Sequence, residues 1–227
     1  MKVIGINASP RGSRSQTLRL VRAVLKGAKS KGADIELVDL CRLNIQYCSG
    51  CGVCHRKGKC VKKDGFQSLY EKLLAADSLV MGSPNYFMSV TAQMKALIDR
   101  MADAIHCQLF TGKYAVNVAT SGGIGQDRQA TDYLNRIMIN YGCFLTGSVG
   151  TSVRLGPKAM DEAERKAFRL GEKLVRDIGK GKIYKRQEKI HAANRQYFRD
   201  LVRTRKDEWP YEYEYWRRAE RKERRLK

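Results

Sequence analysis

The 227 residues of this chain suffice for one ordinary domain with its own hydrophobic core plus an extension, and two full domains would be crowded into that length. Lys and Arg number 44 against 23 Asp and Glu, and the net charge of +21 favours acidic partners through long-range steering. No stretch approaches the roughly 20 apolar residues that a membrane span needs, and the first residues enter a strand pattern rather than a signal peptide. These features exclude a membrane-spanning protein and predict a cytoplasmic one.

The first third of the chain alternates apolar runs with helical periodicity. Residues 3–8 form a short apolar run that stops at Ser-Pro-Arg-Gly-Ser, which indicates a buried strand entering a loop. Apolar residues then recur at helical spacing from Ser15 until a Lys-Gly pair ends the helix near Gly32. Residues 35–40 read as a second strand, and residues 44–64 form a cysteine-rich loop without periodicity.

The same alternation continues to residue 178. The predicted helices are 66–76, 90–105, 128–141 and 161–178, and the predicted strands are 78–82, 114–119 and one within 143–153. Five strands thus alternate with five helices, the pattern of an α/β, doubly wound parallel sheet that helices cover on both faces. Right-handed crossovers then leave few topologies.

The composition changes after Gly179. Residues 180–227 hold 17 Lys and Arg against eight acids, so this segment is basic. A narrow apolar stripe predicts a helix here; its members are Ile190, Tyr197, Phe198, Leu201 and Val202. The aromatic residues Trp209, Tyr211, Tyr213 and Tyr215 alternate at period two, which predicts an extended arm. We therefore divide the chain into a sheet domain, 1–180, and a basic, helical and aromatic extension, 181–227.

The loop from residue 9 to residue 17, Ser-Pro-Arg-Gly-Ser-Arg-Ser-Gln-Thr, joins the first strand to the first helix. A helix start offers unpaired N–H groups and a partial positive charge, and hydroxyl and guanidinium groups lie beside it here. The loop is neither the dinucleotide fingerprint Gly-x-Gly-x-x-Gly nor a Walker loop, which favours a mononucleotide other than ATP. The alternative is a serine-rich helix cap with its arginines in solvent.

Two further loops follow predicted strands at the edge where a ligand of such a sheet is contacted. The loop after the third strand offers aromatic faces for a flat ring, and the loop after the fourth offers small residues for close backbone approach. With the first loop they outline one binding site, whose predicted residues are Ser9, Arg11, Ser13, Ser15, Gln16, Thr17, Pro84, Asn85, Tyr86, Phe87, Thr120, Ser121, Gly122 and Gly123.

These motifs resemble the flavodoxin-like, NAD(P)H-dependent FMN reductase family. Residues 82–86, followed by Lys95, Asp99 and Arg100, resemble that family's Ser-Pro-x-Tyr loop and Lys-x-x-x-Asp-Arg helix. Residues 9–17 resemble its Ser-Pro-Arg-x-x-Ser-Asn-Thr loop, with Gln16 in place of the usual Asn. The resemblance covers residues 1–180 and implies strand order 2-1-3-4-5 and FMN as cofactor.

Four of the seven cysteines crowd into the loop in the pattern Cys48-x2-Cys51-x2-Cys54-x5-Cys60. In a reducing cytosol such crowding favours metal ligation or redox chemistry over disulfides. Thiolates spaced in this way fold round a cubane, which predicts one 4Fe-4S cluster. A zinc site, a redox dithiol and a metal-free loop remain as alternatives. The other three, Cys41, Cys107 and Cys143, lie in apolar stretches and are predicted core residues.

Within the flavin reductases, this spacing resembles that of the iron-sulfur flavoproteins of anaerobic archaea and bacteria. The resemblance implies a homodimer, or a tetramer made of two, in which the cluster of one subunit lies near the FMN of its partner. It also implies a ferredoxin-like electron donor, and the basic charge of the chain suits an acidic one.

The sequence thus predicts an FMN-dependent oxidoreductase in which electrons enter singly at the cluster, pass to FMN and leave to a small acceptor. No catalytic side chain is required. His55 either tunes the cluster or meets solvent, whereas His106 and His191 are interpreted as structural or surface residues. One rival hypothesis is an FMN-only NAD(P)H-dependent quinone or flavin reductase with idle cysteines. Another is a redox sensor that binds nucleic acid through the tail, which the acids interspersed among the basic residues disfavour.

Overall fold

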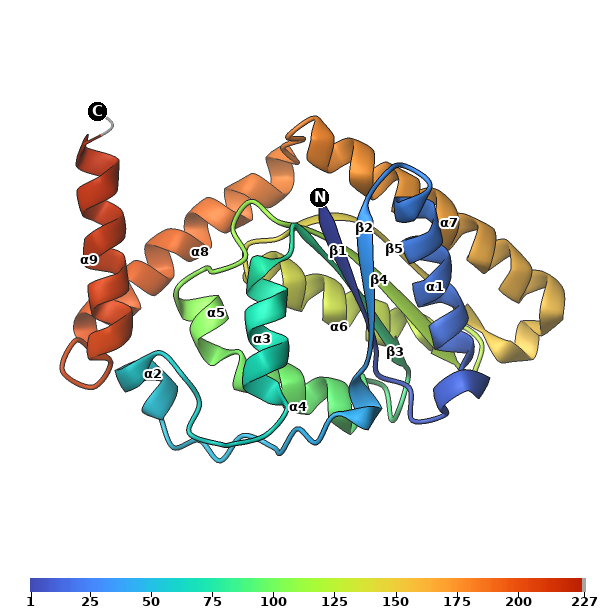
Figure 1. Ribbon diagram of the computed structural model, residues 1–227, viewed down its shortest axis with the longest axis horizontal. Coiled ribbons are helices and arrows are strands. Elements are labelled where there is room, and N and C mark those ends of the chain that lie inside the picture. The colour runs from blue at the N-terminus through green and yellow to red at the C-terminus, as the bar shows by residue number, and fades with distance from the viewer. Residues whose placement is uncertain (226–227) are drawn as a thin grey trace.

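The computed structural model describes the backbone of residues 1–225 and side chains through Arg221; Leu226 and Lys227, part of the predicted extension, lie outside the described residues. A five-stranded parallel sheet has the order β2-β1-β3-β4-β5 (Figure 1). Its strands are β1 (Lys2–Asn7), β2 (Asp34–Asp39), β3 (Ser78–Pro84), β4 (Tyr114–Ser121) and β5 (Phe144–Ser152). This order and the all-parallel pairing confirm the flavodoxin-like fold predicted from the sequence.

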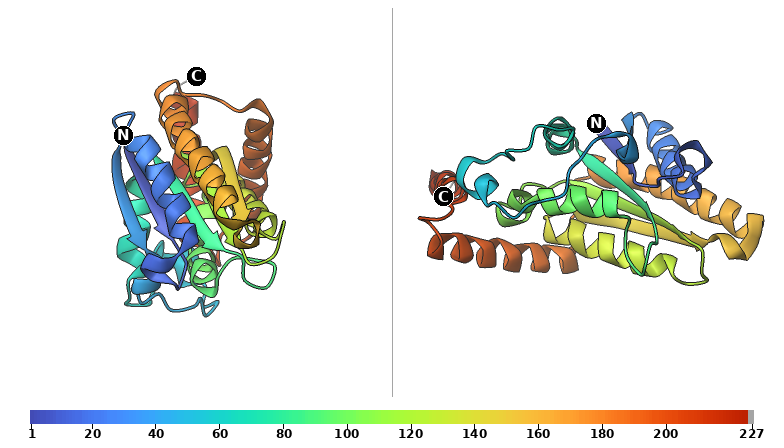
Figure 2. Two further views of the ribbon diagram at one scale, coloured as in Figure 1. Left: turned by 90° about the vertical axis from the view of Figure 1, so that its right-hand side faces the viewer. Right: turned by 90° about the horizontal axis from the view of Figure 1, so that it is seen from below.

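Helices cover both faces of the sheet (Figures 1 and 2). One face packs against α1 (Gln16–Lys29) and α7 (Gly156–Gly179), and the other packs against α3 (Phe66–Ala75), α4 (Ala92–Arg100), α5 (Ala102–His106) and α6 (Asp127–Asn140). Helices α1 and α7 cross closely because both carry glycine at the crossing. A Cβ added at Gly27 would lie 2.0 Å from the carbonyl oxygen of Phe168, and one at Gly171 would lie 2.0 Å from that of Val24.

Two segments differ from their predicted outline. The helix predicted over 90–105 is broken at Met101 into α4 and α5, and Asp103 of α5 accepts a hydrogen bond of 2.9 Å from the Tyr70 hydroxyl in the core. The cysteine-rich loop contains a short helix, α2 (Val53–Lys57), bounded by left-handed Gly52 and Gly58. Five residues are too few to show helical periodicity in a sequence. Short 3₁₀ turns occupy Gly12–Arg14, Leu40–Arg42 and Val153–Leu155.

The extension consists of α8 (Lys185–Thr204), which confirms the predicted helix, and α9 (Pro210–Arg225). Helix α8 begins beside the free edge of β5. There the Gln187 side chain accepts from the Leu145 N–H at 2.7 Å and donates to the Leu145 carbonyl at 3.0 Å, as a neighbouring strand would. None of the helices in residues 1–225 is both long enough and apolar enough to span a bilayer.

The extended arm predicted for residues 209–215 is wrong, because residues 210–215 lie in helix α9, which Trp209 directly precedes. Pro210 stands at its first position, where the fixed φ of proline favours a helix start. The buried residues on this segment are Glu212 and Trp216, four apart, with half-buried Trp209 three before Glu212. That spacing is helical, and the alternating tyrosines had concealed it.

The predicted core cysteines differ in burial. Cys107 and Cys143 are buried, as predicted, whereas Cys41 is half-buried, because it lies in the surface turn that follows edge strand β2.

Candidate functional site

The three predicted binding loops meet at the carboxyl edge of the sheet. They line a cavity of about 100 Å³ formed by Ser9, Arg11, Gln16, Thr17, Pro84, Asn85, Tyr86, Thr120, Ser121, Gly122 and Val153. All but one of these residues were predicted. Val153 was missed because it is an apolar residue after β5, a strand to which the sequence analysis assigned no binding loop. Four predicted residues, Ser13, Ser15, Phe87 and Gly123, lie outside the lining.

The donors in this cavity suit an anionic group. The backbone N–H groups of Gln16 and Thr17, in the first turn of α1, have no acceptor among the described residues. The Thr17 hydroxyl contacts the Thr120 hydroxyl at 2.6 Å across the cavity floor, and the Arg11 side chain is exposed beside it. Ser15 instead caps α1, because its hydroxyl accepts from the Leu18 N–H at 3.0 Å. The cavity has the volume of about three water molecules, which suits the phosphate end of a ligand.

The loop after β3 is a tight hairpin with a strained tip. Tyr86 and Ser89 exchange two backbone hydrogen bonds of 2.9 and 3.1 Å, and the two residues between them, Phe87 and Met88, have φ of 46° and 66°. A left-handed conformation costs a residue with a Cβ about 1–2 kcal/mol. Phe87 is fully exposed and Met88 is 72% exposed. Strain and exposed apolar surface therefore coincide at the rim of the cavity, where a flat apolar ring would find a surface to contact.

The four clustered cysteines line a second cavity, of about 80 Å³. Its wall includes Cys48, Cys51, Cys54 and Cys60 together with Asp99 and Arg100 of α4. All four are free thiols. The structure therefore brings together the four predicted metal ligands, and the two cavities share no lining residue.

Arg100 holds the cysteine loop from within. Its side chain is buried and donates to Cys60 Sγ at 3.2 Å, to the Asp64 carboxylate at 2.5 Å and to the Gln46 carbonyl at 3.2 Å. Burial alone would raise the pKa of Asp64, but the hydrogen bonds from Arg100 and from backbone N–H groups lower it below its ordinary value. The carboxylate is therefore charged and the loop is tied to α4. The sequence identified Arg100 only as part of a family motif.

The thiols of the loop differ in their tendency to ionise. The Val53 N–H group beside the Cys51 sulfur lowers the pKa of that thiol. Burial, followed by the negative charge of Asp103, raises the pKa of Cys54 to about 11. A metal at this loop would have to displace the proton from Cys54, since thiolates are the ligands.

Residues 1–156 match the model of the NADPH-dependent FMN reductase family. The chain belongs to this family.

Two curated relatives of the chain are iron-sulfur flavoproteins. An iron-sulfur flavoprotein of Archaeoglobus fulgidus is 35% identical over 176 residues, 77% of this chain and 79% of the relative. An iron-sulfur flavoprotein of Methanocaldococcus jannaschii is 31% identical, over 79% of this chain and 94% of the relative. A solved FMN-dependent NADH-azoreductase of Bacillus anthracis in complex with FMN has a TM-score of 0.59 and 15% identity, over 77% of this chain and 100% of that chain, and shares the fold.

Membership in the FMN reductase family makes the chain an FMN-dependent oxidoreductase. The family match ends at Gly156, where α7 begins, so it includes every residue that lines the two cavities. It does not include the residues of α9 that contact the cysteine loop. Those contacts were missed in the sequence. His55 lies 2.7 Å from the Glu212 carboxylate and His106 lies 3.0 Å from it, although the three residues are far apart in the chain.

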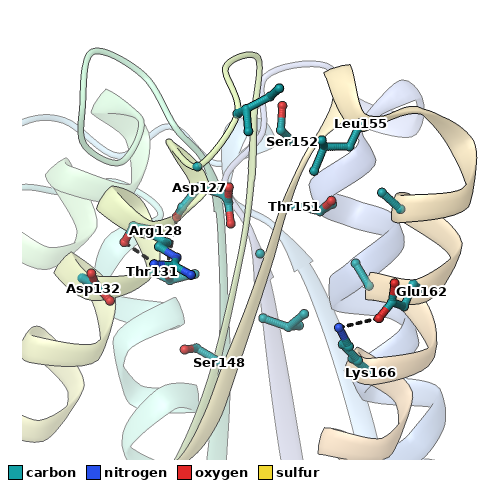
Figure 3. A pocket seen from close by; sticks show the side chains of 16 residues that line it. Asp127, Arg128, Thr131, Asp132, Ser148, Thr151, Ser152, Leu155, Glu162 and Lys166 are labelled. Atoms are coloured by element: carbon teal, nitrogen blue, oxygen red, sulfur yellow. Dashed lines mark hydrogen bonds and ion pairs between the residues drawn. The ribbon is translucent and has the colours of Figure 1, made fainter.

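A larger cavity than these two lies elsewhere in this member of the FMN reductase family. A groove of about 920 Å³ runs between α6, β5 and α7 (Figure 3). Its charged side chains are Asp127, Arg128, Asp132 and the Glu162–Lys166 ion pair, whose exposure leaves it well solvated. No predicted site residue lines it, and its side chains converge on no single point in the close view.

Proposed function

We propose that the chain transfers electrons from a ferredoxin-like donor through a 4Fe-4S cluster to FMN and on to a small acceptor. The observation that carries the proposal is that all four clustered cysteines line one cavity in a chain of the FMN reductase family. When bound, the cluster supplies single-electron transfer, and FMN supplies an acceptor of one or two electrons. The protein supplies the binding sites and their electrostatics.

The cavity of about 100 Å³ that the three predicted loops line, which we call the flavin cavity, fits the phosphate end of FMN. We assign phosphate binding to the free N–H groups of Gln16 and Thr17, the hydroxyls of Ser9 and Thr17 and the guanidinium of Arg11. Pro84, Asn85, Tyr86 and Phe87 would contact the ring, with Thr120, Ser121, Gly122 and Gly123 opposite them. Ser13 and Ser15 would shape the start of α1 rather than contact the ligand. On this assignment residues 1–180 form the flavin-binding domain and residues 181–227 its extension.

The chemistry of the second cavity fits a cluster better than a single ion. Zinc held by four thiolates at about 2.3 Å would draw the sulfurs into a compact group. Among the described residues, one group of ligands is compact enough for a single ion, and it comprises His55, His106 and Glu212 without any of these cysteines. We assign the cluster to Cys48, Cys51, Cys54 and Cys60, with the buried cation of Arg100 stabilising the Cys60 thiolate.

The charges around the cysteines suit an acidic donor. Residues 43–63 contain no Asp or Glu, and four exposed cations flank the ligands in this segment: Arg56, Lys57, Lys59 and Lys63. An acidic donor would be steered to this surface at low ionic strength. Since the two cavities of one chain share no residue, we also propose a homodimer, or a tetramer made of two, that brings the cluster of one subunit to the flavin of another.

Anaerobic purification tests the cofactors. We expect about four iron and four sulfide per chain, in keeping with a cubane on four thiolates, together with FMN. A flavin spectrum without iron or sulfide would instead leave an FMN-only reductase that uses NAD(P)H.

Stopped-flow reduction by an acidic ferredoxin tests the docking surface. We expect the second-order rate constant to fall steeply with ionic strength in the wild type. The variant Lys57→Glu should show a smaller rate constant and a weaker salt dependence, whereas Lys29→Glu, an equal charge change on α1, should match the wild type. Equal behaviour of the two variants would refute docking at the cysteine loop.

A further inference from the structure

Helix α9 packs directly on the cysteine loop although the two are about 150 residues apart in the sequence. The views of Figures 1 and 2 show α9 beside α2 at the end of the molecule away from α1 and α7. The Tyr211 ring lies against the backbone of Gly58, the residue that ends α2. A Cβ added at Gly58 would lie 2.2 Å from Tyr211 Cζ, so only glycine allows this contact.

A buried carboxylate stands at the centre of this contact. The Glu212 side chain of α9 is fully buried, and each of its oxygens pairs with a histidine. Oε1 lies 2.7 Å from Nδ1 of His55 in α2, and Oε2 lies 3.0 Å from Nδ1 of His106 in α5. The indole of Trp209 stacks on both imidazoles, with ring centroids 4.8 Å apart in each case. Three helices therefore meet at one carboxylate.

The pairing is complete without a metal ion. Because an ionised carboxylate can only accept, each imidazole must donate its Nδ1 proton to a different carboxylate oxygen, which satisfies the anion as buried charges require. Burial would raise the pKa of Glu212, but the hydrogen bonds from His106 and His55 lower it below its ordinary value. The carboxylate is therefore charged, and it holds α2 against α5 and α9.

The carboxylate of Glu212 is connected to one of the clustered cysteines through His55. His55 directly follows Cys54, so a hydrogen bond to the His55 ring fixes the turn of α2 that presents this thiol. Because Glu212 pairs with the residue next to Cys54, its negative charge stands close to the turn that carries this sulfur.

We propose that Glu212 is a positioning residue for the iron-sulfur site: it holds the Cys54 turn in place through His55 and lowers the reduction potential of the cluster through its charge. This inference rests on the proposed function, since it requires a cluster at the cysteines. It assigns a role to the extension, which lies beyond the part of the chain matched by the family model. An outer partner of this kind orients a ligand and tunes the metal that the ligand holds.

Two variants separate the position of the carboxylate from its charge. Glu212→Gln keeps the shape and removes the charge, whereas Glu212→Asp keeps the charge and withdraws it from the histidines. Glu214→Gln is the matched control, because Glu214 lies on the same helix and pairs with exposed Arg217 and Arg218. Each protein is purified anaerobically as the full chain with its cofactors.

Three measurements follow: iron and FMN content, the rate of iron transfer to a chelator, and a potentiometric titration of the cluster monitored by electron paramagnetic resonance. We expect iron transfer to be about tenfold faster in both Glu212 variants, as for other outer-shell partners. The midpoint potential should become more positive in Glu212→Gln, because a reduced cluster no longer faces that anion, and should change less in Glu212→Asp. Glu214→Gln should match the wild type.

The outcomes distinguish this inference from the proposed function. A wild type without iron refutes the proposed function and with it the role of Glu212. A wild type with iron, whose release rate and potential match those of Glu212→Gln, refutes the role of Glu212 alone. Loss of FMN as well as iron in Glu212→Gln would show general misfolding and overturn a role confined to the loop. A stoichiometric second metal that Glu212→Gln removes would overturn it in favour of an ion at the two histidines.

Discussion

The flavin cavity and the cysteine loop are built in opposite ways. The flavin cavity is formed by short turns directly after β1, β3, β4 and β5, so the pairing of the strands places its residues. The cysteine loop spans about 20 residues with one short helix, and side chains from distant elements hold it: Arg100 from α4, and Tyr211 and Glu212 from α9. A sheet therefore positions the first site and buried polar contacts position the second, which makes the second more sensitive to single substitutions.

The largest expected effect is the loss of one cluster ligand. Cys60→Ser should remove nearly all iron from the anaerobically purified protein, because Cys60 is one of the four proposed ligands that line the cavity and its sulfur accepts from Arg100. FMN content should remain that of the wild type, since the two cavities share no residue. Iron, sulfide and flavin assays on the same sample measure both. Cys41→Ser, outside the cavity, should keep its iron; retention of a full cluster in Cys60→Ser would remove this cysteine from the ligand set.

Removing the buried cation should be the next largest effect. Arg100→Leu leaves the Asp64 carboxylate buried without its partner, which should cost about 3–5 kcal/mol in the free energy of unfolding. Urea denaturation followed by circular dichroism measures this value. The control is Lys95→Leu on the same helix, where the lost Lys95–Asp99 pair is exposed and should cost less than about 1 kcal/mol. Similar losses in both variants would mean that the loop does not depend on Arg100.

The difference between the flavin cavity and the cysteine loop also explains how much of each could be predicted from the sequence. Local patterns predicted the alternation of strands and helices and most of the flavin cavity, because each turn lies next to the strand that positions it. The strand order was implied by the family resemblance. The four cysteines were recognised from their spacing, but Glu212 was not, since its neighbours His55 and His106 are 157 and 106 residues away. The tyrosines around it, alternating in the sequence, suggested an extended arm, whereas the packing of Trp209, Glu212 and Trp216 selects a helix. Long-range polar pairing leaves no periodic signal.

At the flavin cavity, the loss of one hydroxyl group should have a smaller effect than the loss of the buried Arg100 cation. Thr17→Val preserves the shape of the side chain but removes a donor from the cavity floor and leaves the buried Thr120 hydroxyl without its partner at 2.6 Å. We expect FMN affinity to fall about tenfold, or roughly 1.4 kcal/mol, the value of one polar contact. Titration of the flavin-free protein with FMN, followed by fluorescence quenching, measures it. Thr204→Val on α8 is the control, and an unchanged affinity in Thr17→Val would exclude Thr17 from binding.

The junction between the sheet and the extension should show the smallest effect, and one that depends on pH. Asp177 near the end of α7 is buried and pairs with Lys173 at 3.0 Å and with the Tyr184 hydroxyl just before α8. Burial opposes its ionisation, yet these partners lower the pKa of Asp177 below its ordinary value of 3.8. Because the folded-state pKa is the lower one, this stabilisation is complete above about pH 5 and is lost as the pH falls through the folded pKa.

Asp177→Asn should therefore lower the free energy of unfolding by about 1 kcal/mol at neutral pH, and by less as the pH approaches 3. Urea denaturation at a series of pH values compares it with the wild type and with Asp34→Asn, a substitution at an exposed position. A constant difference between Asp177→Asn and the wild type across this range would mean that the carboxylate charge does not hold the extension. If the unfolding free energies of Asp177→Asn and the wild type converge at low pH, the charge of Asp177 stabilises the junction between the sheet domain and the extension. That junction connects the sheet, which positions the flavin cavity, to the helices that contact the cysteine loop.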